Sequence, residues 1–262
     1  MIASIQTNVK YGVPRMPRKS ETPSLADMSA APGGAAAVDR ALSLLNVFRS
    51  GDAALGLSEL AQRTSMYKST ILRLTASLEH AGFLQRQDDG RYALGAAVAR
   101  LNAIYTASFS LENVVMPVLR QLVKRTGESA AYHVVQGPPP MQSRLCLYRV
   151  DSPHPIRDHI KAGDLLPLDR GAGGRVLLAF GEHKPGNLSA KSRKLLALVR
   201  EQGYFAGIGD RQDEVAGISA PVFHADGRLA AALTLTMPAH RYTDLHVKPL
   251  LEAARELGPQ LL

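Results

Sequence analysis

Residues 67–77, YKSTILRLTAS, contain a lysine, several hydroxyl groups and an arginine, which a single helix would present together. At 100° per residue, one side of that helix carries Ile71, Leu74, Thr75 and Leu78, and the opposite side carries Ser69, Arg73, Ala76, Ser77 and His80. Small polar side chains let a helix approach a DNA groove, and an arginine there reaches a guanine edge or a phosphate. In an isolated helix, Ser69 or Thr70 as first-turn residues and a solvated Arg73 would explain the same pattern.

The neighbouring segments favour DNA contact. Two amphipathic stretches, AVDRALSLLNVFRS and LSELAQRT, precede this helix, and only Ser65 and Met66 separate it from the second. After Gly82, two short extended pieces flank the turn formed by Asp88, Asp89 and Gly90, which predicts a hairpin. Residues 35–95 are therefore predicted to form a winged helix-turn-helix. The predicted DNA contacts are Tyr67, Lys68, Ser69, Thr70, Arg73, Ser77, Arg86 and Arg91.

The arginines of the wing have two interpretations. Arg86 and Arg91 flank the acidic turn, where they can contact phosphate. They can equally pair with Asp88 and Asp89 as in an ordinary hairpin.

The rest of the chain divides into three parts. Residues 1–34, rich in proline and small residues, are predicted to be a disordered arm, and the basic cluster of this arm is either a solvated tail or a weak DNA contact. Residues 96–110 read as a linker helix. Residues 111–262 mix helical and strand-like segments, including a hairpin around Asp226 and Gly227 and a predicted turn at residues 138–140. The expected fold is α+β with two domains, the second an antiparallel sheet flanked by helices.

Composition sets broad limits. The 262 residues carry a net charge of +8, but residues 1–110 and 111–262 share the excess equally, so a nucleic-acid partner must be argued from local pattern. The single cysteine, Cys146, excludes a zinc cluster built on several thiolates and an intrachain disulfide. No apolar run reaches the length of a membrane span, and no secretory signal is apparent, which favours a cytoplasmic protein without a membrane partner.

Catalytic motifs are not apparent in the sequence. His154 and His159 are the closest histidine pair with an acid between them, but Pro155 argues against a metal-binding helix there. Metalloprotease, nucleophile-elbow, P-loop and dinucleotide fingerprints are not found. We therefore expect no enzyme activity, cofactor or metal site.

The predicted DNA-binding unit resembles the isocitrate lyase regulator (IclR-type) transcription factors. The similarity lies in Lys68-Ser69-Thr70, Arg73-Leu74, Leu78-Glu79, Gly82-Phe83 and Tyr92-Ala93-Leu94-Gly95. The chain departs from the family pattern at Ser65-Met66-Tyr67, so operator identity does not carry over. Members of this family bind DNA as dimers or dimers of dimers, so the resemblance implies promoter DNA as a partner and a homodimer or homotetramer.

The resemblance continues more loosely after residue 110, in PLDRGAGGRVLLAF and in the long segment from Gln202 to Pro238. It implies a GAF-like effector domain with a pocket lined by these segments. The pocket residues carried over are Gly171, Ala172, Gly173, Gly174, Ile208, Gly217, Thr234 and Thr236. The glycines could leave N–H groups free to bind a carboxylate, or form only a flexible turn. Thr234 and Thr236 share a strand face and either orient an acid or reflect β-propensity.

Departures from the family pattern bear on the ligand. Gly171, Arg175, Ile208 and Gly217 stand where the family often has other, mostly more polar, residues, which predicts a pocket less polar than that of a glyoxylate sensor. A carboxylic acid that is aromatic or partly apolar is therefore expected. Further candidates, each also compatible with a surface or core role, are His133, Tyr148, Arg149, His154 and Arg157.

The sequence thus predicts a DNA-binding regulator of a catabolic operon whose second domain senses a small carboxylic acid. The alternative is a DNA-binding protein whose second domain serves only oligomerisation.

Overall fold

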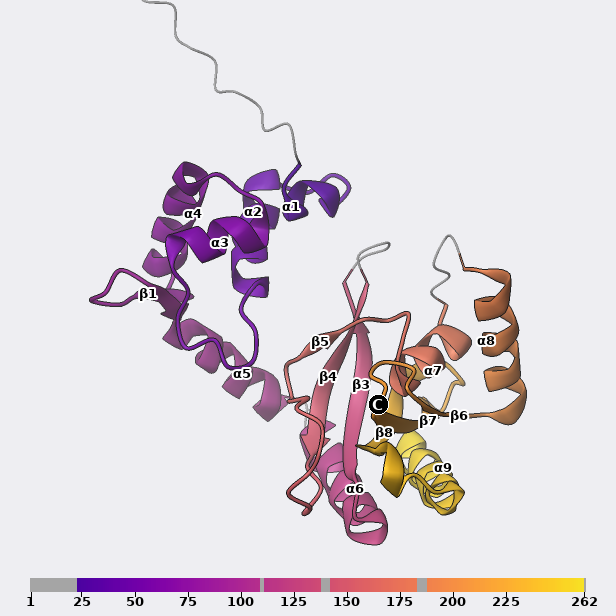
Figure 1. The fold of residues 1–262 in the computed structure, drawn as a ribbon. Coiled ribbons are helices and arrows are strands. Elements are labelled where there is room, and N and C mark those ends of the chain that lie inside the picture. The colour runs from indigo at the N-terminus through magenta and orange to yellow at the C-terminus, as the bar shows by residue number, and fades with distance from the viewer. Residues whose placement is uncertain (1–22, 109–110, 138–141, 183–187, 262) are drawn as a thin grey trace, which may run out of the picture.

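The fold consists of a small helical unit with a two-stranded wing and a larger unit built on one antiparallel sheet, joined by a helix (Figure 1). A computed structural model describes residues 23–108, 111–137, 142–182 and 188–261. The connecting helix is α5 (Ala96–Ser108), which corresponds to the predicted linker.

The small unit contains α2 (Ala36–Asn46), α3 (Leu57–Thr64), α4 (Lys68–His80), β1 (Leu84–Arg86) and β2 (Tyr92–Leu94). Ile71 and Leu78 of α4 are buried against α2 and α3, and Leu74 packs on the same cluster, as the helical spacing predicts. Ser65 ends α3 in the left-handed conformation at φ 56°, which makes the turn into α4 tight. The predicted winged helix-turn-helix is confirmed.

Two glycines fit the wing against α4. Gly82 follows the helix at φ 74°, a conformation that favours glycine. Gly95 follows β2, and a Cβ atom there would overlap the carbonyl oxygen of Gly82. This close backbone contact fixes the base of the wing relative to α4.

The arm differs from the expectation within its described part. Residues 1–22 lie outside the described residues. In the remainder, α1 (Leu25–Met28) is a short helix, capped by Ser24, whose hydroxyl accepts from the N–H of Asp27. Asp27 also pairs with Arg40 of α2 at 2.7 Å. The capping pattern and this ion pair order a segment for which composition predicts disorder.

The large unit is a six-stranded antiparallel sheet in the order β5-β4-β3-β8-β7-β6. The strands are β3 (Ser129–Gln136), β4 (Ser143–Val150), β5 (Leu165–Leu166), β6 (Phe205–Ile208), β7 (Val215–Phe223) and β8 (Leu229–Pro238). The helices are α6 (Leu111–Thr126), α7 (Ala172–Phe180), α8 (Ala190–Gln202) and α9 (Val247–Leu257), with short 3-10 turns at Ala239–Arg241, Asp244–His246 and Gly258–Gln260. The predicted α+β class is confirmed.

The two faces of this sheet differ. Alternate residues of β7 and β8, such as Ile218, Leu233 and Leu235, form the main core with α6 and α9. The opposite face is covered by α7, with α8 packed on its outer side. Strands β5 and β6 were not foreseen, and the predicted turn at residues 138–140 lies outside the described residues.

Candidate DNA-binding surface and effector pocket

The surface of α4 that was expected to face DNA is open. Lys68, Ser69, Arg73 and Ser77 are exposed, and Thr70 is partly exposed. Tyr67, 55% exposed, occupies the N-cap position, but its side chain does not cap the helix. Ser69 and Thr70 lie in the first turn, with no cap role. The positive end of α4 thus carries one cation and two hydroxyl groups.

The wing arginines take different roles. Arg91 pairs with Asp89 at 2.7 Å, as in the ordinary hairpin interpretation. The guanidinium of Arg86 lies 5.9 Å from the ring centre of Tyr92, a cation–π distance. Both arginines remain exposed on the same two-stranded element.

A second candidate site lies between the start of α7 and the sheet. The residues lining it are Arg144, Ile160, Gly171, Ala172, Gly207, Asp210, Arg211, Val215, Ala216, Gly217, Thr234 and Thr236. Five of the eight pocket residues predicted from the sequence line this cavity: Gly171, Ala172, Gly217, Thr234 and Thr236. A sixth, Gly173, lies next to the side chains of Arg144 and Thr234. The cavity is small, about 20 Å³, which is room for about one water molecule.

The glycines here provide space. A Cβ atom on Gly173 would lie 2.6 Å from Arg144 Nη1 and 2.9 Å from Thr234 Oγ1. A Cβ atom on Gly217 would lie 2.9 Å from the Cβ of Ala172, so this glycine lets α7 lie directly on β7. Gly174 packs against the carbonyl of Leu168.

A carboxylate of the chain already occupies part of the helix start. The N–H of Gly171 donates to Asp210 Oδ2 at 2.6 Å, and Asp210 also accepts from Arg175 at 2.8 Å. An acidic ligand at this helix therefore has to use the remaining donors of the site.

Thr234 and Thr236 share the α7 face of β8, as strand alternation predicts. Ser219 donates to the carbonyl of Leu233, and its Oγ lies 2.9 Å from Thr234 Oγ1. His133 Nδ1 lies 3.3 Å from the same Thr234 atom. These three contacts are all hydrogen bonds when Thr234 donates to Ser219 and accepts from a protonated Nδ1 of His133.

Basic groups dominate the surroundings of His133. Burial, together with Arg144, Arg149 and Arg211, holds the pKa of His133 well below its usual value, so the imidazole is neutral. Burial and the neighbouring Arg211 lower the pKa of Arg144 to about 10, which leaves it protonated at neutral pH.

One expectation about the pocket needs correction. Ile208 is 53% exposed and is not part of the lining, because it is in phase with Ala206, which packs against the α6/α9 core on the other face of the sheet. Its neighbour Gly207 faces the cavity instead. The expectation of a pocket less polar than that of a glyoxylate sensor stays a prediction, and Arg144, Asp210 and Arg211 are the charged residues that line the cavity.

Sequence reasoning missed several of these residues. Arg144 is in phase with Cys146 on β4, and both are buried on the α7 face, so strand alternation could have indicated it. Asp210 and Arg211 follow β6, a strand too short to predict, and no local pattern marks them.

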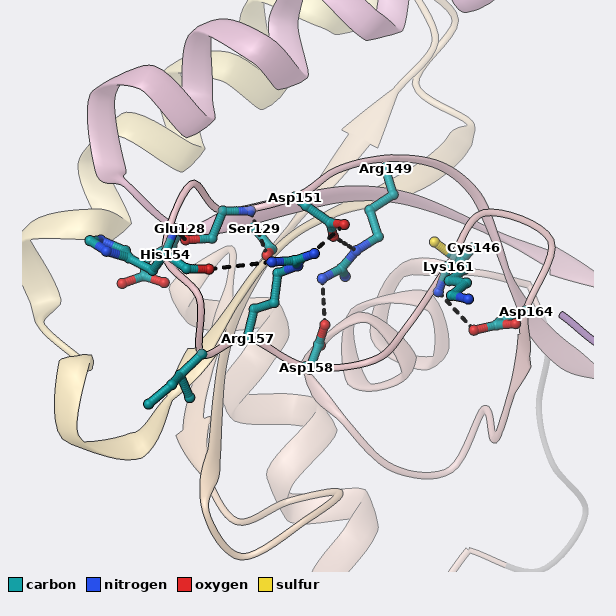
Figure 2. Close-up of polar contacts among 12 residues, drawn as sticks. Glu128, Ser129, Cys146, Arg149, Asp151, His154, Arg157, Asp158, Lys161 and Asp164 are labelled. Carbon is teal, nitrogen blue, oxygen red and sulfur yellow. Dashed lines mark hydrogen bonds and ion pairs between the residues drawn. The ribbon is translucent and has the colours of Figure 1, made fainter. Parts of the chain in front are cut away.

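The remaining candidates lie at the end of β4 and along the segment that follows it. Figure 2 shows the guanidinium of Arg149 between Asp151 and Asp158, with which it pairs. Arg157 is more exposed and reaches Asp151 at 3.4 Å. His154 is exposed and Tyr148 partly buried, and neither lines the cavity.

Two kinds of feature are absent from the described ranges. No helix there has both the length and the apolar character needed to cross a bilayer. Within the same ranges, no three His, Cys, Asp or Glu side chains are grouped to hold a metal ion.

Comparisons with known proteins agree with this architecture. Residues 37–88 match the IclR helix-turn-helix domain, and residues 188–261 match the bacterial transcriptional regulator IclR C-terminal domain. The HTH-type transcriptional regulator KipR of Bacillus subtilis is 24% identical, over 86% of this chain and 94% of that protein.

Solved structures of the same architecture are similar over most of their length. A regulator described as IclR-like, from Silicibacter sp., has 28% identity and a TM-score of 0.71, covering 85% of this chain and 93% of its own. An IclR homologue from Microbacterium hydrocarbonoxydans, solved with 4-hydroxybenzoate, has 23% identity and a TM-score of 0.70, covering 85% and 97%. With both domain types matched in order along one chain, this protein belongs to the IclR family of bacterial transcriptional regulators.

Proposed function

We propose that this regulator binds promoter DNA through α4 and the wing, and that a small carboxylic acid bound between α7 and the sheet changes its DNA affinity. The exposed face of α4 supports DNA binding, because Arg73, Ser69 and Ser77 project from a helix whose other face is buried in the small unit. We expect this action in the cytoplasm, on an operon of catabolic genes.

The cavity between the start of α7 and the sheet supports binding of a small carboxylic acid. It combines cationic side chains, hydroxyl groups and a helix start, which are the groups that bind carboxylates. The 4-hydroxybenzoate in the Microbacterium homologue supports an aromatic acid as one candidate. A ring does not fit a cavity of about 20 Å³, so such a ligand requires the site to widen.

DNA binding is tested by gel shift with the DNA upstream of the gene for this protein. Arg73→Ala is expected to weaken binding about tenfold or more, because it removes a charged groove contact. Arg120→Ala on the exposed side of α6 removes the same charge and should leave the affinity within about twofold. Equal affinities of the two variants would exclude Arg73 from the interface.

Ligand sensing is tested on the same protein. A panel of aliphatic and aromatic carboxylic acids is screened for a rise in the unfolding temperature and for altered gel shifts. If no acid does either, while promoter binding persists, the second domain serves oligomerisation alone.

A further inference from the structure

Buried charge on the α7 face of the sheet is unbalanced. Four arginines, here called the arginine cluster, lie on this face with side chains buried or mostly buried: Arg144, Arg149, Arg175 and Arg211. Only two buried or mostly buried carboxylates, Asp158 and Asp210, accompany them among the described residues. Two positive charges are therefore left without a buried counter-ion.

Both carboxylates are committed to other arginines. Asp210 is bound by Arg175 at 2.8 Å, and Asp158 is bound by Arg149. Arg211 reaches Asp158 Oδ2 only at 3.7 Å, which is beyond hydrogen-bond length. Arg144 has no ion-pair partner within the described ranges, although its residue is only 2% exposed.

More exposed acids do not change this balance. Asp151 has a half-exposed side chain and is shared by Arg149 and Arg157. Asp164 is partly exposed and accepts from the N–H of Lys161. Asp151 therefore offsets the exposed Arg157 as well as Arg149, and within the described residues Asp164 makes no ion pair with the arginine cluster.

Polar atoms without partners gather at the same place. Among the described residues, Arg144 Nε, His133 Nε2, Thr236 Oγ1, Arg211 Nη2 and Asp158 Oδ2 are buried and make no hydrogen bond. Buried polar groups without partners are rare in folded proteins, and a group of them commonly marks an absent ion, ligand or water. Arg144 and Thr236 both line the cavity at the start of α7, a helix of nine residues whose positive end favours anions.

We propose that the pocket takes a ligand with two negative charges, one held by Arg144 and Thr236 at the start of α7 and the other by Arg211. This inference rests on the proposed ligand sensing and specifies the class of ligand. The second anionic group replaces the distant contact between Arg211 and Asp158. A monoanion neutralises only one of the two uncompensated charges, so the site discriminates by charge.

The site can widen without breaking the sheet. Ile160 lies in the irregular segment between β4 and β5, and Arg211 lies in the connection from β6 to β7. Movement of these two segments enlarges a cavity that otherwise holds about one water molecule.

The test measures unfolding temperatures of the full chain at pH 7.5 and constant ionic strength. Matched acids are titrated in pairs, succinate against butyrate and phthalate against benzoate, with sulfate and inorganic phosphate as further dianions. Each effective dianion should produce a given shift at a concentration about tenfold or more below that of its monoanionic partner.

Variants test which arginines hold the two negative charges of the ligand. Arg144→Gln and Arg211→Gln are each expected to remove the preference for dianions, and, because each loses an uncompensated buried charge, to keep or raise the ligand-free unfolding temperature. Arg228→Gln, at a 70% exposed arginine in the β7–β8 turn, should keep the preference. A lower ligand-free unfolding temperature with the preference intact would mean that the arginines have a structural role and would overturn the proposal.

The remaining outcomes separate the two proposals. Equal responses to the members of each pair would overturn the dianion inference and leave acid sensing in place. Failure of every anion to shift the unfolding temperature would overturn both. A response to sulfate and phosphate but to no dicarboxylate would support a dianion site and overturn sensing of a carboxylic acid.

Discussion

Thr234 and Thr236 lie two residues apart on β8 and face the same cavity, but their hydroxyl groups are in opposite situations. Thr234 Oγ1 is within hydrogen-bond distance of both Ser219 and His133. Thr236 Oγ1 is buried and has no partner among the described residues. The first hydroxyl stabilises the ligand-free fold, whereas the second lowers its stability and is free for a ligand.

Replacement by valine, which keeps the shape of threonine, distinguishes these roles. Thr234→Val should lower the free energy of unfolding by about 1–3 kcal/mol, because two buried partners lose a hydrogen bond. Thr236→Val should change it by less than about 0.5 kcal/mol or raise it, because an unpaired polar atom is removed. Urea unfolding of both variants measures the difference, and equal destabilisation would contradict this account.

Individual pocket residues could be predicted only in part. Strand alternation was sufficient to place the two threonines on one face, because it depends on spacing alone. Ile208 was assigned to the pocket from the family resemblance alone, because the strand that holds it was not recognised and its face was therefore unknown. The ion pairs of Asp158 and Asp210 link segments far apart in sequence, and no local pattern predicts them.

The wing and α4 form one packed unit because their backbones touch. At Gly95 a side chain would collide with the carbonyl of Gly82, which is backbone and cannot turn aside. At Gly56, the residue before α3, a Cβ atom would meet only the end of the Glu59 side chain, at 3.3 Å. The same substitution at the two glycines therefore has different costs.

Gly95→Ala is expected to lower the free energy of unfolding by about 1–3 kcal/mol and to weaken DNA binding, because the wing shifts relative to α4. Gly56→Ala is the matched control, with an expected loss below about 1 kcal/mol. Thermal unfolding and gel shifts of both proteins provide the comparison. A Gly95→Ala protein as stable as wild type would show that the wing is not fixed by this contact.

Elements with strong periodicity were predicted, and short ones were not. The apolar spacing of α4 and the alternation of β8 arise because each element buries one face, and the sequence shows both patterns. Strands β5 and β6 have two and four residues, too few for a pattern, and exist because a neighbouring strand offers hydrogen bonds. Hydrogen bonds to neighbouring strands, and not the local sequence pattern, determine the conformation of these two segments.

The assembly of two chains is expected to involve α2 and α5. Val38 and Leu42 on α2 are 55% and 50% exposed, and Leu101 and Tyr105 on α5 are exposed at the same four-residue spacing. An exposed apolar stripe of this kind marks an interaction surface. Helix-turn-helix regulators read two half-sites as dimers, so a second copy of this chain is the expected partner.

Leu101→Lys should weaken dimer formation about tenfold or more, because it places a charge in an apolar contact. Ala99→Lys is the matched control, since residue 99 is also exposed and lies about 200° around the helix from Leu101. Light scattering over a dilution series measures both. A Leu101→Lys protein that dimerises like the control would show that the dimer interface lies elsewhere.

The segment between β4 and β5 has a consequence for solubility. The N–H of Cys146 donates to the carbonyl of Asp164, and Gly163 donates back to Cys146, so this segment closes the outer edge of β4 beyond the two residues paired with β5. An open strand edge is a template for pairing with another chain and leads to aggregation. The loop that carries Asp158 and Ile160 into the pocket therefore also shields the sheet, which limits how far it can swing outward without loss of soluble protein.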